Sequence, residues 1–305
     1  MYVVTGATGH TGSVIAKTLL AQGKRVRVVG RNTDRLNSLV SLGAEPFAAD
    51  ITNKEAITEA FTGAEAAYVM IPPDLANPDY APYQDSVTEA LASAVQKEMP
   101  AHVVALSSFG ADKPDKTGPI AGLHRLEERL KQISGLNALY IRAGYFMENT
   151  LPQARVIQQM GATLGPLNAL LKIPMIATRD IGTFAAGELL RLEFRGHQAR
   201  ELLGERDLTM TEATAIIAQA IGRPELQYSQ ITYDQFRAFL MQMGASQRTA
   251  DMMVEMAESQ NSGFIRALEP RSQRNTTPTS YEQFVAEQFV PAYQASSAGV
   301  TSARA

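Results

Sequence analysis

The sequence predicts an α/β protein with a doubly wound parallel sheet in the strand order 3-2-1-4-5-6. Along residues 1–146, six short apolar stretches alternate with five amphipathic ones, strand before helix. Short connections between such pairs are typical of parallel strands joined by right-handed crossovers. The strands are continuous apolar stretches, as expected where helices cover both faces of a sheet.

The first half divides into strands and helices with recognisable ends. Strands are predicted at residues 2–5, 25–29, 45–49, 66–71, 102–107 and 138–142. Helices are predicted between them at residues 13–22, 34–42, 53–61, 83–98 and 123–133. Helix stops follow at Gly23, Gly43, Gly63, Pro100 and Gly135. We also expect Asp34 to cap the second helix, since a carboxylate can accept the free N–H groups of a first turn.

The link between the first strand and the first helix is rich in glycine. It reads Gly6-Ala7-Thr8-Gly9-His10-Thr11-Gly12. Gly6 permits a tight turn, Gly9 lets the backbone approach a pyrophosphate, and Gly12 permits close helix–strand packing. The helix N-terminus adds free N–H groups and a positive dipole end. We therefore predict a Rossmann dinucleotide site rather than a plain turn, with contacts from Gly6, Thr8, Gly9, His10, Thr11 and Gly12.

The residues after the next three strands bear on the choice of dinucleotide. NAD sites place an acid after the second strand, but this chain has Arg31, with Arg35 one turn later. Both arginines can hold a 2′-phosphate, so we expect NADP(H) to be preferred over NAD(H). Asp50 either meets the adenine edge or caps the next helix. Ile71 and Pro72 either form an apolar wall over the ribose and nicotinamide or simply end the fourth strand.

The second half is less regular and predicts a smaller lobe. Helices are predicted at residues 178–192, 211–221, 233–243, 246–258 and 280–289, the last with a capping box from Thr279 to Glu282. Residues 201–204 and 226–231 are candidate strands, the first of them as a seventh strand of the main sheet. We expect a Rossmann domain over 1–150, completed by elements within 177–205. A smaller α+β substrate or partner lobe then covers 151–292, and 295–305 form a disordered tail.

Composition excludes several kinds of site. The 305 residues include no Cys and four His, and the net charge is −3. Disulfides, thiolate chemistry and a zinc site are therefore not expected, nor is a basic nucleic-acid surface. No apolar stretch reaches the roughly 18 residues of a membrane span, and structured sequence starting at Tyr2 leaves no room for a signal peptide. We expect a cytoplasmic monomer or homodimer.

The glycine loop and the strand order resemble the extended and atypical short-chain dehydrogenase/reductase superfamily. That resemblance implies a serine after the fifth strand, then Tyr-x-x-x-Lys on the next helix. Ser107 and Ser108 are present, but no tyrosine lies between Tyr83 and Tyr140. On the following helix His124 and Glu128 have the expected spacing instead, and a glutamate cannot do the work of that lysine.

Other segments resemble the NmrA-like branch of this superfamily. They are Leu123 to Glu128, Arg142 to Asn149, and Arg271 with residues 276–280. The resemblance extends to about Phe289. It implies either an NAD(P)H-dependent quinone or azo-dye reductase, or a redox-sensing protein that binds dinucleotide and regulates a protein partner. Both kinds lack the Tyr-x-x-x-Lys pair, so the resemblance leaves this choice open.

Chemistry is still possible without that pair. Hydride transfer to a quinone needs an apolar slot and a hydrogen-bond donor, but no base that removes a proton from carbon. The candidate catalytic residues are His124 and Ser107, although His124 can equally cap its helix or face solvent. Ser107 is also a candidate cofactor contact, since Ser107 and Ser108 are expected to hydrogen-bond the cofactor or the backbone rather than to act as nucleophiles. Candidate substrate residues are Phe109, Tyr145, Phe146 and Asn149, whose rings either stack on a flat acceptor or pack the second lobe. We predict a reductase of a quinone-like or small aromatic acceptor, with a non-catalytic NADP(H) sensor as the alternative.

Overall fold

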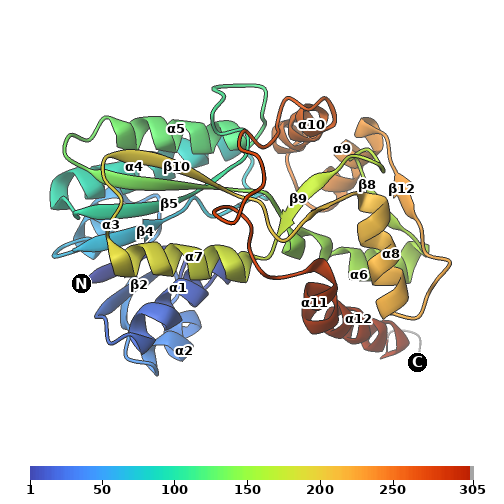
Figure 1. Ribbon diagram of the computed structural model, residues 1–305, viewed down its shortest axis with the longest axis horizontal. Helices are drawn as coiled ribbons and strands as arrows, with labels where there is room; N and C mark the ends of the chain where they lie inside the picture. Colours follow the sequence, from blue (N-terminus) through green and yellow to red (C-terminus); the bar gives the residue numbers. More distant parts are fainter. Residues whose placement is uncertain (303–305) are drawn as a thin grey trace.

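The computed structural model describes residues 1–302, with side chains as far as residue 296. Two lobes lie side by side in it (Figure 1). The first is built on a parallel sheet in the order β10-β6-β5-β4-β1-β2-β3, which confirms the predicted order and the predicted seventh strand, here β10 beside β6. Its strands are β1 Tyr2–Val4, β2 Val26–Gly30, β3 Glu45–Ala48, β4 Ala66–Val69, β5 His102–Ser108, β6 Asn137–Ala143 and β10 His197–Leu202.

Helices cover both faces of this sheet (Figure 1). On one face lie α1 His10–Ala21 and α7 Thr178–Arg191. On the other lie α3 Lys54–Ala60, α4 Tyr80–Glu98 and α5 Ile120–Lys131. Gly182 of α7 explains how closely the first pair packs, because a Cβ there would lie 2.7 Å from the Cβ of Val14 in α1. The short α2, Asn37–Val40, follows a 3₁₀ turn at Thr33–Leu36.

The second lobe joins short strands to helices around its own apolar core. Its strands are β7 Tyr145–Phe146, β9 Ile173–Ile176 and β11 Asp207–Leu208 in one sheet, and β8 Thr163–Gly165 with β12 Tyr228–Gln230 in another. Its helices are α6 Gln153–Met160, α8 Met210–Ala220, α9 Tyr233–Gln242, α10 Gln247–Asn261, α11 Tyr281–Phe284 and α12 Val290–Ser302. A 3₁₀ turn at Met147–Thr150 follows β7, and a π-helical turn at Val285–Phe289 joins α11 to α12.

Two glycines let the lobes meet closely. A Cβ on Gly144, just after β6, would lie 2.6 Å from the carbonyl oxygen of Pro174. A Cβ on Gly204, after β10, would lie 1.7 Å from the carbonyl oxygen of Met175, and this glycine has φ +73°. Strand β9 therefore lies against the carboxyl ends of β6 and β10, where ligands bind in open α/β folds.

Several predicted details were wrong. Asn32, not Asp34, caps the turn before α2, because its Oδ1 accepts the Asp34 N–H at 2.8 Å. Ser280, not Thr279, caps α11, since the Thr279 hydroxyl is bound to Asp180 at 2.7 Å. The seventh strand begins at His197 rather than at residue 201. The prediction missed its first residues because they are exposed and mostly polar, so they form no apolar stretch.

The end of the chain and the lobe boundaries stay predictions. Helix α12 runs through residues 295–302 of the segment 295–305 that we expected to be disordered. Residues 303–305 of that segment lie outside the described part. Strand β7, which follows β6, pairs with β9 in the second lobe rather than with the main sheet. Among residues 1–302, no helix combines the length and apolar character that a bilayer span requires.

Candidate functional site

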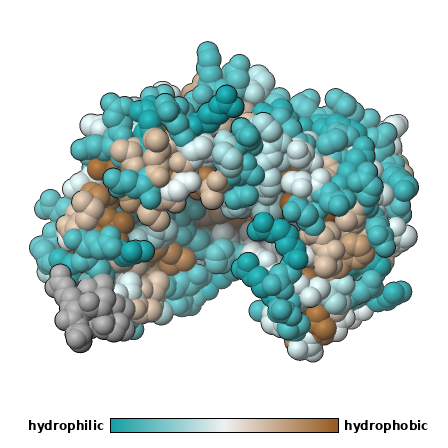
Figure 2. Space-filling view, turned by 180° about the vertical axis from the view of Figure 1, so that it is seen from behind, coloured by the Kyte–Doolittle hydropathy of each residue, from teal (hydrophilic) through white to brown (hydrophobic). Residues whose placement is uncertain are grey.

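A cavity of about 600 Å³ lies between the two lobes. Figure 2 shows the surface hollowed there, seen from behind. Its walls come from the carboxyl ends of β4, β5 and β6, from the start of α4 and α5, and from the segments around β9 and after α10. A cavity of this size suits a ligand with a few fused rings, and its walls are mostly apolar.

The glycine loop adjoins this cavity and fits a dinucleotide. Gly6 has φ +61°, and a Cβ there would lie 2.6 Å from the sulfur of Met70, which itself lines the cavity. A Cβ on Gly12 would lie 2.3 Å from the Gly6 carbonyl oxygen, so only glycine lets α1 start this close to the loop. Gly9 is the N-cap of α1 and has no side chain to cover the first N–H groups. These groups can receive the phosphates.

The other residues of the loop divide into two kinds. Thr8 and His10 are exposed, so their side chains are free to meet a ligand. Thr11 is buried, and its hydroxyl bonds to that of Tyr68 at 2.9 Å. Any contact from Thr11 must therefore come from its backbone N–H rather than its side chain.

Arg31 and Arg35 follow β2 and Asp50 follows β3, across β1 from the strands β4, β5 and β6 that border the cavity, and none of the three lines it. Both arginines are exposed. Asp50 accepts hydrogen bonds from the N–H and hydroxyl of Thr52 at 2.9 and 2.7 Å, which lower the pKa of its carboxyl, with a smaller contribution from Arg31. Asp50 thus orders the turn before α3, whose cap is Asn53. Arg31 remains available for a phosphate.

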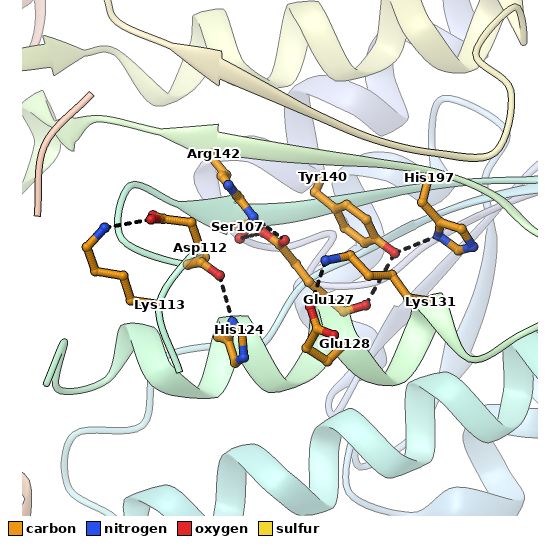
Figure 3. A network of polar contacts seen from close by, with 11 residues as sticks. Ser107, Asp112, Lys113, His124, Glu127, Glu128, Lys131, Tyr140, Arg142 and His197 are labelled. Carbon is orange, nitrogen blue, oxygen red and sulfur yellow. Dashed lines mark hydrogen bonds and ion pairs between the residues drawn. The ribbon is translucent and has the colours of Figure 1, made fainter. Parts of the chain in front are cut away.

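A buried charge network underlies the cavity at the end of β5 (Figure 3). Glu127 of α5 is 1% exposed, and Arg142 of β6 donates to both of its oxygens, at 3.0 and 2.6 Å. Ser107 donates its hydroxyl to the same carboxylate at 2.6 Å. A carboxylate held by a guanidinium only accepts hydrogen bonds, so the single proton of Ser107 is committed to Glu127. Ser107 therefore offers the cavity lone pairs rather than a proton.

His124 does not join this network. Its Nδ1 lies 2.9 Å from the carbonyl oxygen of Ala111, in the loop after β5. Figure 3 shows the ring on α5, beside that loop. The neighbouring Leu123 lines the cavity instead. This geometry favours the reading in which His124 fastens the loop to the helix, and its catalytic role stays a prediction without direct support.

The predicted substrate residues do come together. Phe109, Tyr145, Phe146 and Asn149 all line the cavity, with Ser107 and Ile71, whereas Pro73 takes the place expected for Pro72. The position of Tyr145 agrees with both interpretations, contact with an acceptor and packing of the second lobe, since its ring also packs on the apolar core of that lobe. Burial raises the pKa of Tyr145 to about 12, so its hydroxyl stays protonated at neutral pH.

Sequence reasoning missed Gln84 and Glu127. Gln84 of α4 is 2% exposed and lines the cavity. Its Nε2 donates to the Pro119 carbonyl oxygen at 2.9 Å, which leaves Oε1 buried with no partner among the described residues. A buried acceptor of this kind is costly unless a ligand or water supplies a donor. No motif includes Gln84, and the Leu123–Glu128 segment includes Glu127 without showing its role, because both roles depend on contacts between elements far apart in the sequence.

Residues 2–285 match the NmrA-like family. The chain belongs to that family. The match runs from β1 into the π-helical turn after α11 and thus includes the glycine loop and both lobes. The resemblance inferred from the motifs is thereby confirmed.

Two relatives that align with most of this NmrA-like protein are each less than 30% identical to it. An NAD(P)H azoreductase of Xenophilus azovorans is 28% identical over 260 residues, which are 84% of this chain and 86% of the relative. A (4-alkanoyl-5-oxo-2,5-dihydrofuran-3-yl)methyl phosphate reductase of Streptomyces griseus is 29% identical over 278 residues, 90% and 93% of the two chains.

Solved structures agree on the fold. An NADPH-dependent quinone oxidoreductase of Escherichia coli, complexed with NADPH, superimposes with a TM-score of 0.78. The two chains are 22% identical, and the alignment covers 95% of this chain and 100% of the other. At that identity the likeness concerns the architecture.

Proposed function

We propose that this protein is an NADPH-dependent reductase that transfers hydride to a quinone-like or small aromatic acceptor bound in the cavity between the lobes. The observation that carries the proposal is the cavity itself, an apolar space of about 600 Å³ that adjoins the glycine loop through Met70. The relatives named as NAD(P)H-dependent azoreductase and quinone oxidoreductase support the same class of reaction.

The glycine loop supplies the cofactor end of the site. The first N–H groups of α1 and the backbone at Gly9 would hold the pyrophosphate. Arg31, with Arg35, would hold the 2′-phosphate and thereby favour NADP(H) over NAD(H). When bound, the cofactor supplies a hydride, and the chain's part is to place an acceptor against it and exclude competing reactions.

The cavity residues suit a quinone better than a simple ketone. Reduction of a ketone leaves an alkoxide, which needs a strong proton donor, whereas a quinone gives phenolate-like oxygens that water can protonate. Ser107 has its proton committed to Glu127, and His124 is turned to a loop carbonyl. Water can enter where the exposed Lys172 and Arg266 line the cavity. Phe109 and Phe146 offer ring faces for a flat acceptor.

Steady-state oxidation of NADPH with 1,4-naphthoquinone, an azo dye and an aromatic aldehyde tests this proposal. We expect turnover that depends on the quinone. Leu123→Trp narrows the cavity and should lower kcat/KM by at least about tenfold, with the Kd for NADPH unchanged. Leu42→Trp is the matched control, because Leu42 is 55% exposed and away from the cavity.

Binding of NADPH without turnover of any acceptor would refute the reductase. The result would favour the alternative, a sensor whose dinucleotide state is read by a protein partner.

A further inference from the structure

The mouth of the cavity carries two cationic side chains. Lys172 immediately precedes β9, and Arg266 follows α10, so they reach the same cavity from separate segments of the second lobe. Both residues are exposed. Within the described part of the chain, neither takes part in an ion pair. Their charges are therefore open to a ligand.

The nearby acidic groups are already engaged. Asp207 also lines the cavity, but it is paired with Arg271. Glu212 accepts the Thr209 N–H at 2.7 Å in the capping box of α8. Hydrogen bonds from Thr209 chiefly lower the pKa of Glu212, with a small contribution from Lys172. The mouth thus keeps a local excess of positive charge on a chain whose net charge is −3.

Behind the two cations the cavity wall is apolar. Leu106, Phe109, Ile120, Phe146 and Ile265 line it. A flat ring system fits against such a wall, and a charged substituent on its outer end would stay hydrated while meeting the cations. A ligand charged at its inner end would lose its hydration without a free partner, since Glu127 and Arg142 neutralise each other.

We propose that the acceptor is an aromatic compound with an anionic substituent, a carboxylate, sulfonate or phosphate, which Lys172 and Arg266 bind at the mouth. The inference rests on the proposed function and names its substrate class. Contacts at such an exposed mouth are screened by salt and act mainly on capture of the substrate. They should therefore change KM rather than kcat, by about two- to fivefold for each cation.

A matched pair of quinones tests the inference. The kcat/KM is measured for 1,4-naphthoquinone and for 1,4-naphthoquinone-2-sulfonate, at low and high salt. The variants are Lys172→Gln, Arg266→Gln and the double substitution. Lys97→Gln is the control, because Lys97 lies far from the cavity. It is in the last turn of α4, whereas the residue that begins that helix, Tyr80, lines the cavity. The Kd of each quinone for the protein loaded with NADP⁺ gives a second readout that needs no turnover.

In the double variant we expect kcat/KM for the sulfonate to fall by about fourfold to twenty-fivefold. High salt should remove the same preference for the sulfonate, and kcat/KM for the neutral quinone should not change. An unchanged ratio of sulfonate to neutral quinone would overturn the inference while leaving the reductase intact. An equally large loss of NADPH affinity in the double variant would also overturn the inference, because the two cations would then bind the cofactor. Selective binding of the sulfonate without turnover would instead support the anion site and refute the reductase.

Discussion

The buried pair of Glu127 and Arg142 gives a sharp prediction about stability. Glu127→Gln keeps the shape of the side chain but removes the charge that accepts two hydrogen bonds from Arg142 and one from Ser107. The guanidinium of Arg142, which is 12% exposed, would then face an amide that has only one acceptor atom. Breaking a buried pair in this way costs about 3–5 kcal/mol of unfolding free energy.

Urea unfolding followed by circular dichroism measures this cost. Glu128→Gln is the matched control, because Glu128 is 50% exposed and pairs with Lys131 on the surface, where the loss is about 0–1 kcal/mol. Replacing both partners, as Glu127→Leu with Arg142→Leu, should recover most of the lost stability, since no unpaired charge remains. A loss below about 1 kcal/mol for Glu127→Gln, equal to the surface control, would refute the reasoning.

Three further predictions concern the cofactor and the acceptor. Gly12→Ala places a Cβ 2.3 Å from the Gly6 carbonyl oxygen. It should lower the unfolding free energy by about 1–3 kcal/mol and also weaken NADPH binding. Gly187→Ala is the control, because the added Cβ meets only the flexible end of Arg191 at 3.4 Å, and it should stabilise α7 by up to about 1 kcal/mol. Calorimetry measures the stability of both variants, and equal effects would contradict the close packing of Gly12 against Gly6. Arg31→Ala should weaken NADPH binding by about tenfold and leave NADH unchanged, and an unaltered preference in fluorescence titrations would remove Arg31 from the phosphate site. His124→Ala should change kcat for naphthoquinone by less than about threefold, because its ring is bound to the Ala111 carbonyl, and a large fall in kcat at constant KM would restore its catalytic role.

The main sheet was predictable because its signals are local. Buried strands such as β5 contain consecutive apolar residues, and glycines or prolines mark the ends of the helices between them. The glycine loop lies between a strand and a helix, so its place in the fold followed directly. Strand β10 was only partly recognised, since it lies at the sheet edge and its first residues are exposed.

The second lobe and the floor of the cavity were harder to predict. Strands β8 and β9 span only a few residues each, too short to show a period. Glu127 lies on helix α5, but its partner Arg142 lies on strand β6, so the neighbours of Glu127 along the helix do not reveal the pairing. Lys172 and Arg266 look like ordinary surface charges in the sequence, and only the folded chain brings both to one cavity.

The most direct test of the proposed reductase is a single-turnover experiment. The protein loaded with NADPH is mixed rapidly with 1,4-naphthoquinone, and the near-ultraviolet absorbance of the reduced nicotinamide is followed, with NADPH and with NADPH deuterated at C4 of the nicotinamide. We expect rapid oxidation that depends on the quinone, slows on deuteration and is slower by at least about tenfold in Leu123→Trp. Stable absorbance in the presence of bound cofactor and quinone, or oxidation equal to that in free solution, would contradict it.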